Sequence, residues 1–179
     1  MSILKVARLG HPVLRAPAKP LSRSDLQGHD VQRFIDDMVE TMRDYHGVGL
    51  AAPQVHVPYR MAVIEAVSEE GTGPEASLTV LINPTLTPAG EDLAEDWEGC
   101  LSIPDLRGRV PRWTSLSVQA LDRQGREVAF EARDFFARVI QHEVDHLDGI
   151  VFLDRMKDMS TLTFLQEYAR YWRGRDADA

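Results

Sequence analysis

The stretch His142-Glu143-Val144-Asp145-His146 places two imidazoles four residues apart, with a carboxylate directly after the first. On an α-helix this spacing turns through about 400°, so both histidines project from one face. Two such nitrogens can bind one metal ion, and Glu143 can reach a water at that ion. The pattern predicts a metal-dependent hydrolase whose class depends on the third ligand.

The residues around this motif predict a buried helix, which Asp134 opens and Gly149 closes. Apolar residues recur at helical spacing on two neighbouring stripes. One stripe holds Phe135, Val139, His142 and His146, and the other holds Phe136, Ile140 and Leu147. Because a helix that is apolar around most of its girth is buried, we expect the histidine pair to lie inside the protein.

The rest of the sequence predicts further helices and several strands. A proline-containing arm over 1–23 precedes a helix that begins at Ser24 or Asp30 and ends at Tyr45, with Gly47 as its left-handed stop. Strands are expected at 60–66, 78–83, 116–121, 127–132 and 150–153, with a surface loop at 67–77 and a hairpin turn at 122–125. Ser160 is expected to cap a last helix, whose inner side would carry Phe164, Leu165, Tyr168 and Trp172.

These elements predict an α+β fold. We expect antiparallel strands in small sheets, packed around the central helix that carries the His-Glu-x-x-His motif, with an N-terminal and a C-terminal helix. The sequence has 179 residues, of which 44% are hydrophobic and 27% are charged. Because these values suit one compact core, residues 1–179 are expected to form a single domain.

Composition also excludes some classes of function. A formal net charge of −8 argues against binding DNA, because phosphate backbones attract clustered lysine and arginine. No apolar run approaches the ~18 residues that span a bilayer, so we expect no membrane contact. The first ten residues lack the apolar core of a signal peptide, and the single cysteine, Cys100, fits a reducing compartment. We therefore expect a cytoplasmic protein.

Two residues are candidates for the third metal ligand. Glu167 lies 21 residues beyond His146 and resembles the downstream glutamate ligand of zinc endopeptidases. Cys100 lies upstream, in Glu98-Gly-Cys-Leu-Ser102, and a thiolate is a strong ligand. A non-catalytic metal-binding module is a third alternative, which would need neither Glu143 nor Gln54.

Three segments together resemble the signature motifs of the peptide deformylase family. They are Gly47-Val-Gly-Leu-Ala-Ala-Pro-Gln54, Glu98-Gly-Cys-Leu-Ser102 and Gln141-His-Glu-Val-Asp-His-Leu-Asp-Gly149. The family patterns are Gly-x-Gly-Leu-Ala-Ala-x-Gln, Glu-Gly-Cys-Leu-Ser and Gln-His-Glu-x-Asp-His-Leu-x-Gly. Every fixed position is met in order, which favours Cys100 over Glu167 as the third ligand.

The resemblance implies that Cys100, His142 and His146 hold one divalent metal ion per chain. The ion would be Fe²⁺ in cells, with Zn²⁺, Ni²⁺ or Co²⁺ as substitutes. The implied reaction is hydrolysis of the N-formyl group from the formylmethionine of new polypeptides. Glu143 would carry the proton, while the side-chain amide of Gln54 and the backbone N–H of Leu101 would stabilise the oxyanion.

The resemblance also implies a set of substrate-binding residues. Gly49 would let a peptide backbone approach closely, although it would equally suit a simple turn. Arg107 matches a family position that contacts substrate. Glu98 would hold the Cys100 loop through an ion pair with Arg112, unless that pair is merely solvated. The apolar candidates for a methionine pocket are Val48, Phe135 and Val139, which core packing alone would also explain.

The implied partners are N-formylmethionyl nascent peptides. Because this substrate emerges from the ribosome, we expect a transient ribosome association, and we expect the protein to be a monomer.

Overall fold

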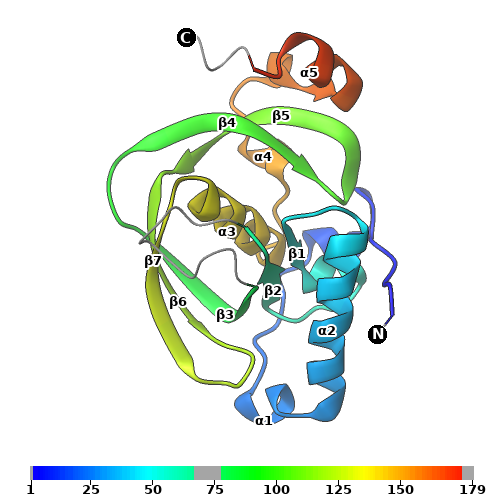
Figure 1. Ribbon diagram of the computed structural model, residues 1–179, viewed down its shortest axis with the longest axis vertical. Helices are drawn as coiled ribbons and strands as arrows, with labels where there is room; N and C mark the ends of the chain where they lie inside the picture. Colours follow the sequence, from blue (N-terminus) through cyan, green and yellow to red (C-terminus); the bar gives the residue numbers. More distant parts are fainter. Residues whose placement is uncertain (1, 67–77, 175–179) are drawn as a thin grey trace.

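The computed structural model describes residues 2–66 and 78–174. Two antiparallel sheets surround a central helix, α3 (Asp134–Leu147), with α2 (His29–Asp44) on one side and α5 (Leu165–Tyr171) at the periphery (Figure 1). This arrangement confirms the expected α+β class with a buried central helix. The loop expected at 67–77 lies outside the described residues.

The central helix α3 is buried on most of its surface, as its two apolar stripes predict. Gly149 follows it with a φ of 76°, a left-handed conformation that glycine adopts without strain. A Cβ at this position would also lie 2.7 Å from the carbonyl oxygen of Arg15. Gly149 therefore ends the helix and lets the N-terminal arm pass close to it.

The larger sheet lies against α3 and has the strand order β1-β2-β3-β6-β7, with every neighbouring pair antiparallel. Four of its strands occupy the regions that the sequence predicts. The strands are β1 (Gly49–Ala51), β2 (Met61–Ile64), β3 (Thr79–Pro88), β6 (Ser115–Leu121) and β7 (Glu127–Arg133). Their inward side chains form one apolar cluster with α3, which fixes the helix against the sheet.

A smaller sheet, which the sequence did not predict, covers the other side of α3 (Figure 1). It consists of β4 (Leu93–Cys100), β5 (Ile103–Trp113) and β8 (Thr163–Phe164) in that order. The β4–β5 register shifts between Glu98 and Cys100, so the ladder is irregular where the cysteine lies.

The N-terminal segment forms two helices where the sequence predicts one. Ser22 accepts a hydrogen bond from the N–H of Asp25 and caps α1 (Arg23–Leu26), while Gly28 begins α2 with an extended backbone. The expected starts at Ser24 and Asp30 are therefore wrong. His46, with a φ of 55°, takes the left-handed position expected for Gly47, because α2 ends one residue earlier.

The C-terminal segment differs most from the expectation. The chain at 150–153 is no strand: the carboxylate of Asp154 accepts the N–H of Val151 and starts α4 (Phe152–Arg155). Ser160 lies in the short 3₁₀ helix η3 (Met159–Thr161) rather than capping a helix. The last helix, α5, lies on the outside, where only Tyr168 is half-buried and the other side chains expected on its inner side, Phe164, Leu165 and Trp172, are exposed.

The helix α2 packs on the opposite face of β1, β2 and β3 and forms a second apolar cluster with them. A third cluster lies under β4 and β5 and includes Phe152 of α4. Within 2–66 and 78–174, no helix has the length and apolar character needed to cross a membrane.

Candidate metal and active site

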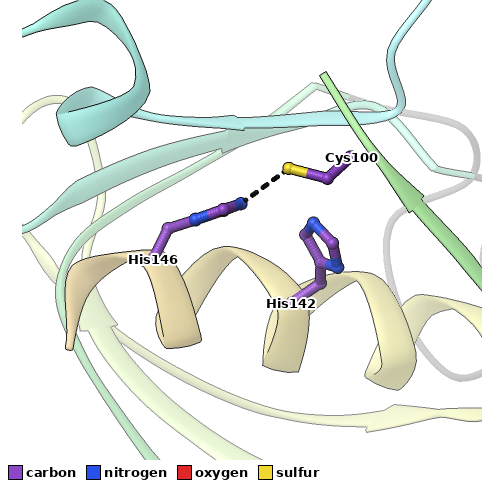
Figure 2. Close-up of side chains that lie close together, drawn as sticks. All are labelled: Cys100, His142 and His146. Atoms are coloured by element: carbon purple, nitrogen blue, oxygen red, sulfur yellow. Dashed lines mark hydrogen bonds between the residues drawn. The ribbon is translucent and has the colours of Figure 1, made fainter. Parts of the chain in front are cut away.

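Three metal-donor side chains meet between α3 and the end of β4 (Figure 2). His142 and His146 project from one face of α3, with their ring centroids 5.0 Å apart. The Sγ atom of Cys100 lies 3.2 Å from Nε2 of His146. One donor atom of each residue lies within 4.8 Å of the other two. The helix spacing and the irregular end of β4 therefore bring together the three residues that the motifs single out.

The electrostatics of this cluster favour a thiolate. Burial alone would raise the pKa of the Cys100 thiol, but the facing imidazoles of His146 and His142 outweigh it and hold the pKa well below its usual range. Burial alone would lower the pKa of His142. Its hydrogen bonds to Cys100 and Glu98 outweigh this effect, so the pKa of His142 lies well above its ordinary value. A deprotonated sulfur beside imidazoles is the state in which a cysteine binds metal.

Glu143 lies beside the cluster and is buried. Within the described residues its Oε2 atom has no hydrogen-bond partner. Burial raises the pKa of this carboxyl group to about 7, against the lowering effect of His142 and His146. A buried carboxylate with an unsatisfied oxygen next to three metal donors is a group that can take up and return a proton.

Gln54 lies in the 3₁₀ helix η2 (Ala52–Val55) and is also buried. Its Oε1 accepts the N–H of Ala51 at 2.8 Å. Its Nε2 therefore turns toward the metal donors, 3.5 Å from Sγ of Cys100 and 3.2 Å from Oγ of Ser102. The carboxamide is held in one orientation with its donor side toward the cluster.

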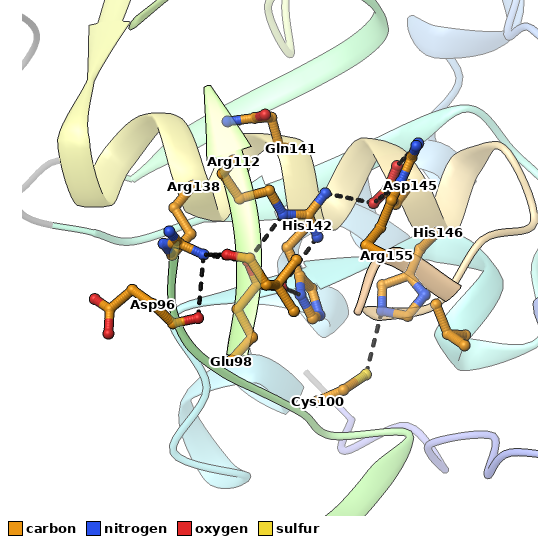
Figure 3. A network of polar contacts seen from close by, with 12 residues as sticks. Asp96, Glu98, Cys100, Arg112, Arg138, Gln141, His142, Asp145, His146 and Arg155 are labelled. Atoms are coloured by element: carbon orange, nitrogen blue, oxygen red, sulfur yellow. Dashed lines mark hydrogen bonds and ion pairs between the residues drawn. The ribbon is translucent and has the colours of Figure 1, made fainter. Parts of the chain in front are cut away.

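A buried network of charges supports the cluster from behind (Figure 3). Glu98 accepts two hydrogen bonds from Arg112, at 2.8 and 3.0 Å, and one from Arg138 at 2.9 Å. Its Oε2 also lies 2.9 Å from Nδ1 of His142. Glu98 is buried and both of its carboxylate oxygens are hydrogen-bonded, so its carboxylate fixes the orientation of the His142 ring.

Asp145 and Gln141, which lie on other faces of α3, also make polar contacts with β5. Asp145 binds Arg112 at 2.5 Å and Arg155 at 2.7 Å, so it points away from the histidine face, as the helical spacing predicts. Gln141 exchanges hydrogen bonds with the backbone of Trp113, at 3.0 and 2.9 Å. These contacts fix α3 against β5.

A cavity of about 380 Å³, here called the site cavity, opens onto the cluster. Its lining comes from the N-terminal arm, the segment after α2, the Cys100 loop, β5, α3 and α5. The lining residues are Val6, Arg8, Tyr45, His46, Gly47, Val48, Gly49, Gln54, Gly99, Cys100, Leu101, Pro104, Asp105, Arg107, His142, Glu143 and Leu165. A hollow of about 200 Å³ adjoins it and shares Gly99, Arg107, His142 and Glu143.

The predicted site residues are distributed between these two spaces. Val48, Gly49 and Leu101 line the site cavity, while Phe135 and Val139 line the adjoining hollow with Glu98, and Arg107 lines both. Val48 and Phe135 are exposed, whereas Val139 is buried. Glu167 lies exposed on α5 and is not among the metal donors that cluster in the described part of the chain.

Three residues near the site had no role in the sequence prediction. Ser102 binds the Gln54 amide, Trp97 lines the adjoining hollow, and Arg8 lines the site cavity. Ser102 belongs to a motif, so its position was an available signal. Arg8 comes from the N-terminal arm, and no local pattern places that arm beside residues 99–107.

The comparisons with known proteins agree with this geometry. Residues 3–161 match the polypeptide deformylase family. Similar curated proteins include peptide deformylase 1 of Prochlorococcus marinus strain MIT 9313, 42% identical over 93% of this chain and 88% of that protein. Another is the peptide deformylase of Thermodesulfovibrio yellowstonii, 41% identical over 94% of this chain and 98% of that protein.

Solved structures give the same result. A class I type b peptide deformylase from Acinetobacter baumannii bound to Met-Ala-Ser has a TM-score of 0.81 and 37% identity, covering 87% of this chain and 100% of that one. A peptide deformylase from Synechococcus elongatus in complex with actinonin has a TM-score of 0.80 and 38% identity, covering 90% of this chain and 82% of that one. The chain described here belongs to the polypeptide deformylase family.

Proposed function

We propose that this protein is a metal-dependent hydrolase that removes the N-formyl group from the formylmethionine of newly synthesised polypeptides and releases formate. The observation that carries the proposal is the convergence of three metal donors, a buried carboxylate and a buried carboxamide on one cavity. Ferrous-loaded protein is expected to release formate from a formylmethionyl peptide. Absence of formate release by freshly loaded wild-type protein would overturn the proposal.

The donor set fits a divalent transition-metal ion. One thiolate and two imidazoles suit Fe²⁺, Zn²⁺, Ni²⁺ and Co²⁺, and three protein ligands leave a position open. The fit is supported by the donor atoms of Cys100 and His146, which are buried and lie 3.2 Å apart. We propose one ion per chain, Fe²⁺ in the cell. When bound, it would polarise the formyl carbonyl and lower the pKa of a water.

Glu143 is the proposed proton carrier. Its pKa of about 7 suits a group that accepts a proton near neutral pH and later returns it. In the proposed reaction Glu143 accepts a proton from the attacking water as the new C–O bond forms. It then delivers this proton to the amide nitrogen as the C–N bond breaks, which yields formate and a free α-amine.

Gln54 and Leu101 are the proposed oxyanion donors. Support comes from the fixed orientation of the Gln54 carboxamide, whose Nε2 faces the metal donors. Leu101 follows Cys100 directly and lines the site cavity, so its backbone N–H lies in the same loop. Hydrogen-bond donors that are already held in position before the reaction stabilise the developing negative charge without a reorganisation cost.

The proposed substrate-binding residues divide by chemistry. Gly49 is proposed to let a peptide backbone approach closely, because it lines the site cavity, and its missing side chain also leaves room for the Glu143 carboxylate. Phe135 and Val139 are proposed for the methionine side chain, and Val48 and Arg107 for the peptide that follows. Glu98 is proposed to act indirectly, through the position of His142.

We further propose that residues 1–179 form one domain and that the protein is a cytoplasmic monomer which associates transiently with the ribosome. Support for the ribosome association is the nature of the substrate, a nascent chain. Co-sedimentation with ribosomes at low and moderate salt tests it. Failure to co-sediment at low salt would remove this part of the proposal.

A further inference from the structure

Ion pairing separates the arginines of this protein into two groups. Although acidic residues outnumber basic ones by 28 to 20, four arginines in 2–66 and 78–174 have no carboxylate partner. Each of the other described arginines has one. The four exceptions are Arg8, Arg107, Arg170 and Arg173.

Two of these four arginines, Arg8 and Arg107, line the site cavity. In an acidic protein most guanidinium groups form an ion pair with a carboxylate. An arginine that has no such partner and lies at the mouth of a cavity is therefore available to a ligand. Two acidic side chains line the site cavity: Asp105, which is exposed at its mouth, and Glu143, which is buried beside the metal donors. The mouth therefore carries two guanidinium groups against one carboxylate.

The N-terminal arm holds Arg8 in place. Ala7 donates its N–H to the carbonyl of Gln54 at 2.7 Å, and Leu9 donates its N–H to the carbonyl of Ser102 at 2.8 Å. Val6 and Ala7 are buried. Because both neighbours of Arg8 are hydrogen-bonded to the segments that carry Gln54 and Cys100, the backbone at Arg8 is fixed at the edge of the cavity.

Arg107 is held in the smaller sheet. It lies in β5, where it pairs with Thr163 of β8. Its guanidinium crosses Gly99, where a Cβ would overlap it, and donates to the carbonyl of Leu106 at 3.1 Å. This leaves most of its N–H groups for a ligand.

We propose that Arg8 and Arg107 select formylated peptides that carry a carboxylate side chain within the first residues after the formylmethionine. The inference rests on the proposed deformylase function and adds a charge preference to it. Arg8 reaches the site cavity from a segment outside the three motifs, so its substitution is the sharper test of this preference. Partly exposed ion pairs are worth up to about fivefold each in affinity, so the preference is moderate.

The test compares three peptides with amidated C-termini, formyl-Met-Ala-Glu, formyl-Met-Ala-Gln and formyl-Met-Ala-Lys. The wild type is expected to rank kcat/KM in that order, with about threefold between steps, chiefly through KM. The ranking should weaken in high salt, because the charges at the mouth are partly exposed. In Arg8→Gln the ratio of kcat/KM for the Glu peptide to kcat/KM for the Lys peptide is expected to fall by about threefold.

Arg170→Gln is the matched control, because Arg170 also lacks a carboxylate partner among the described residues but lies on α5 and does not line the site cavity. Its ratio of kcat/KM for the Glu and Lys peptides should equal that of the wild type. Equal rates on the three peptides, a preference for Lys, or an unchanged ratio in Arg8→Gln would each overturn the inference.

Binding of the deformylated products separates this inference from the proposed function. Calorimetry on metal-loaded protein should find tighter binding of amidated Met-Ala-Glu than of Met-Ala-Lys. If no formyl peptide is hydrolysed but this binding order holds, the proposed function fails and the charge preference stands. If hydrolysis proceeds without any order in rate or binding, the charge preference fails alone.

Discussion

Glu98 holds His142 from the side opposite to Cys100: Oε2 of Glu98 lies 2.9 Å from Nδ1 of His142. The other ring nitrogen of His142 points toward the Cys100 sulfur (Figure 2). Two arginines hold the carboxylate in turn (Figure 3). A hydrogen bond of this kind fixes both the tautomer and the direction of a metal-binding imidazole.

Replacement of this carboxylate should weaken metal binding. In Glu98→Gln the side chain keeps its shape but loses its charge, so we expect a loss of about 10- to 100-fold in metal affinity. Metal retained after dialysis against a graded chelator measures it. Glu95→Gln is the control, because Glu95 lies on the same strand, is exposed, and reaches Arg109 only at 3.8 Å. Equal affinity in the two variants would contradict the role of Glu98.

The identity of the third ligand can be tested with two substitutions. Cys100→Ser should lose most of the bound metal, because a hydroxyl is a much poorer ligand than a thiolate. Glu167→Ala should keep it, because Glu167 is exposed on α5. Metal content by elemental analysis, after circular dichroism has shown that both variants fold, decides the question. The opposite outcome would support the zinc endopeptidase alternative.

Gly49 should tolerate no side chain. A Cβ at this position would lie 2.9 Å from Cγ of Glu143 and would overlap its carboxylate. Gly49→Ala is therefore expected to displace Glu143 and lower kcat by at least about 100-fold with metal content preserved, as is usual for a misplaced proton carrier. Gly90→Ala is the matched control, because a Cβ there meets nothing within 4 Å. An unchanged kcat in Gly49→Ala would show that Glu143 has another position.

Asp154 links the start of α4 to Arg15 of the N-terminal arm and should make stability depend on pH in the acid range. It accepts the N–H of Val151 and pairs with Arg15. Burial alone would raise the pKa of Asp154, but these two partners outweigh it, so its folded pKa lies below the ordinary 3.8. A lowered folded pKa stabilises the protein above the ordinary pKa, and this contribution is lost as pH falls through the folded value.

Asp154→Asn retains an acceptor for Val151 but lacks the charge. Its unfolding midpoint in urea should therefore fall less steeply than that of the wild type as pH drops below about 4. The difference should stay below about 1 kcal/mol, because Asp154 and Arg15 are both more than a third exposed. Parallel profiles for the two proteins would contradict the assignment.

The site was more predictable from sequence than the fold around it. His142, Glu143 and His146 follow from helical spacing alone, because one helix face fixes their relative positions. Cys100 required the family resemblance, since a residue more than forty positions away reaches the helix only through the fold.

The elements that the sequence did not predict correctly were missed for physical reasons. β4 is largely exposed and acidic, and β5 contains Pro104 and Pro111, so neither shows the apolar alternation of a typical strand. The aromatic residues of α5 suggested an inward face, yet Tyr168 and Trp172 pack on Trp97, at 5.0 and 5.8 Å between ring centroids, at the surface. Contacts between residues far apart in the sequence therefore determine where these elements form and how they pack, and local sequence patterns do not reveal such contacts.

The central claim is that Cys100, His142 and His146 hold the metal ion while Glu143 moves the proton. Formate release from a formylmethionyl peptide, measured for wild type and Glu143→Gln at equal metal content, tests it most directly. The account predicts turnover by the wild type and a loss of at least about 100-fold in kcat for the variant, with one metal ion per chain in both. Comparable turnover by the two proteins would contradict the claim.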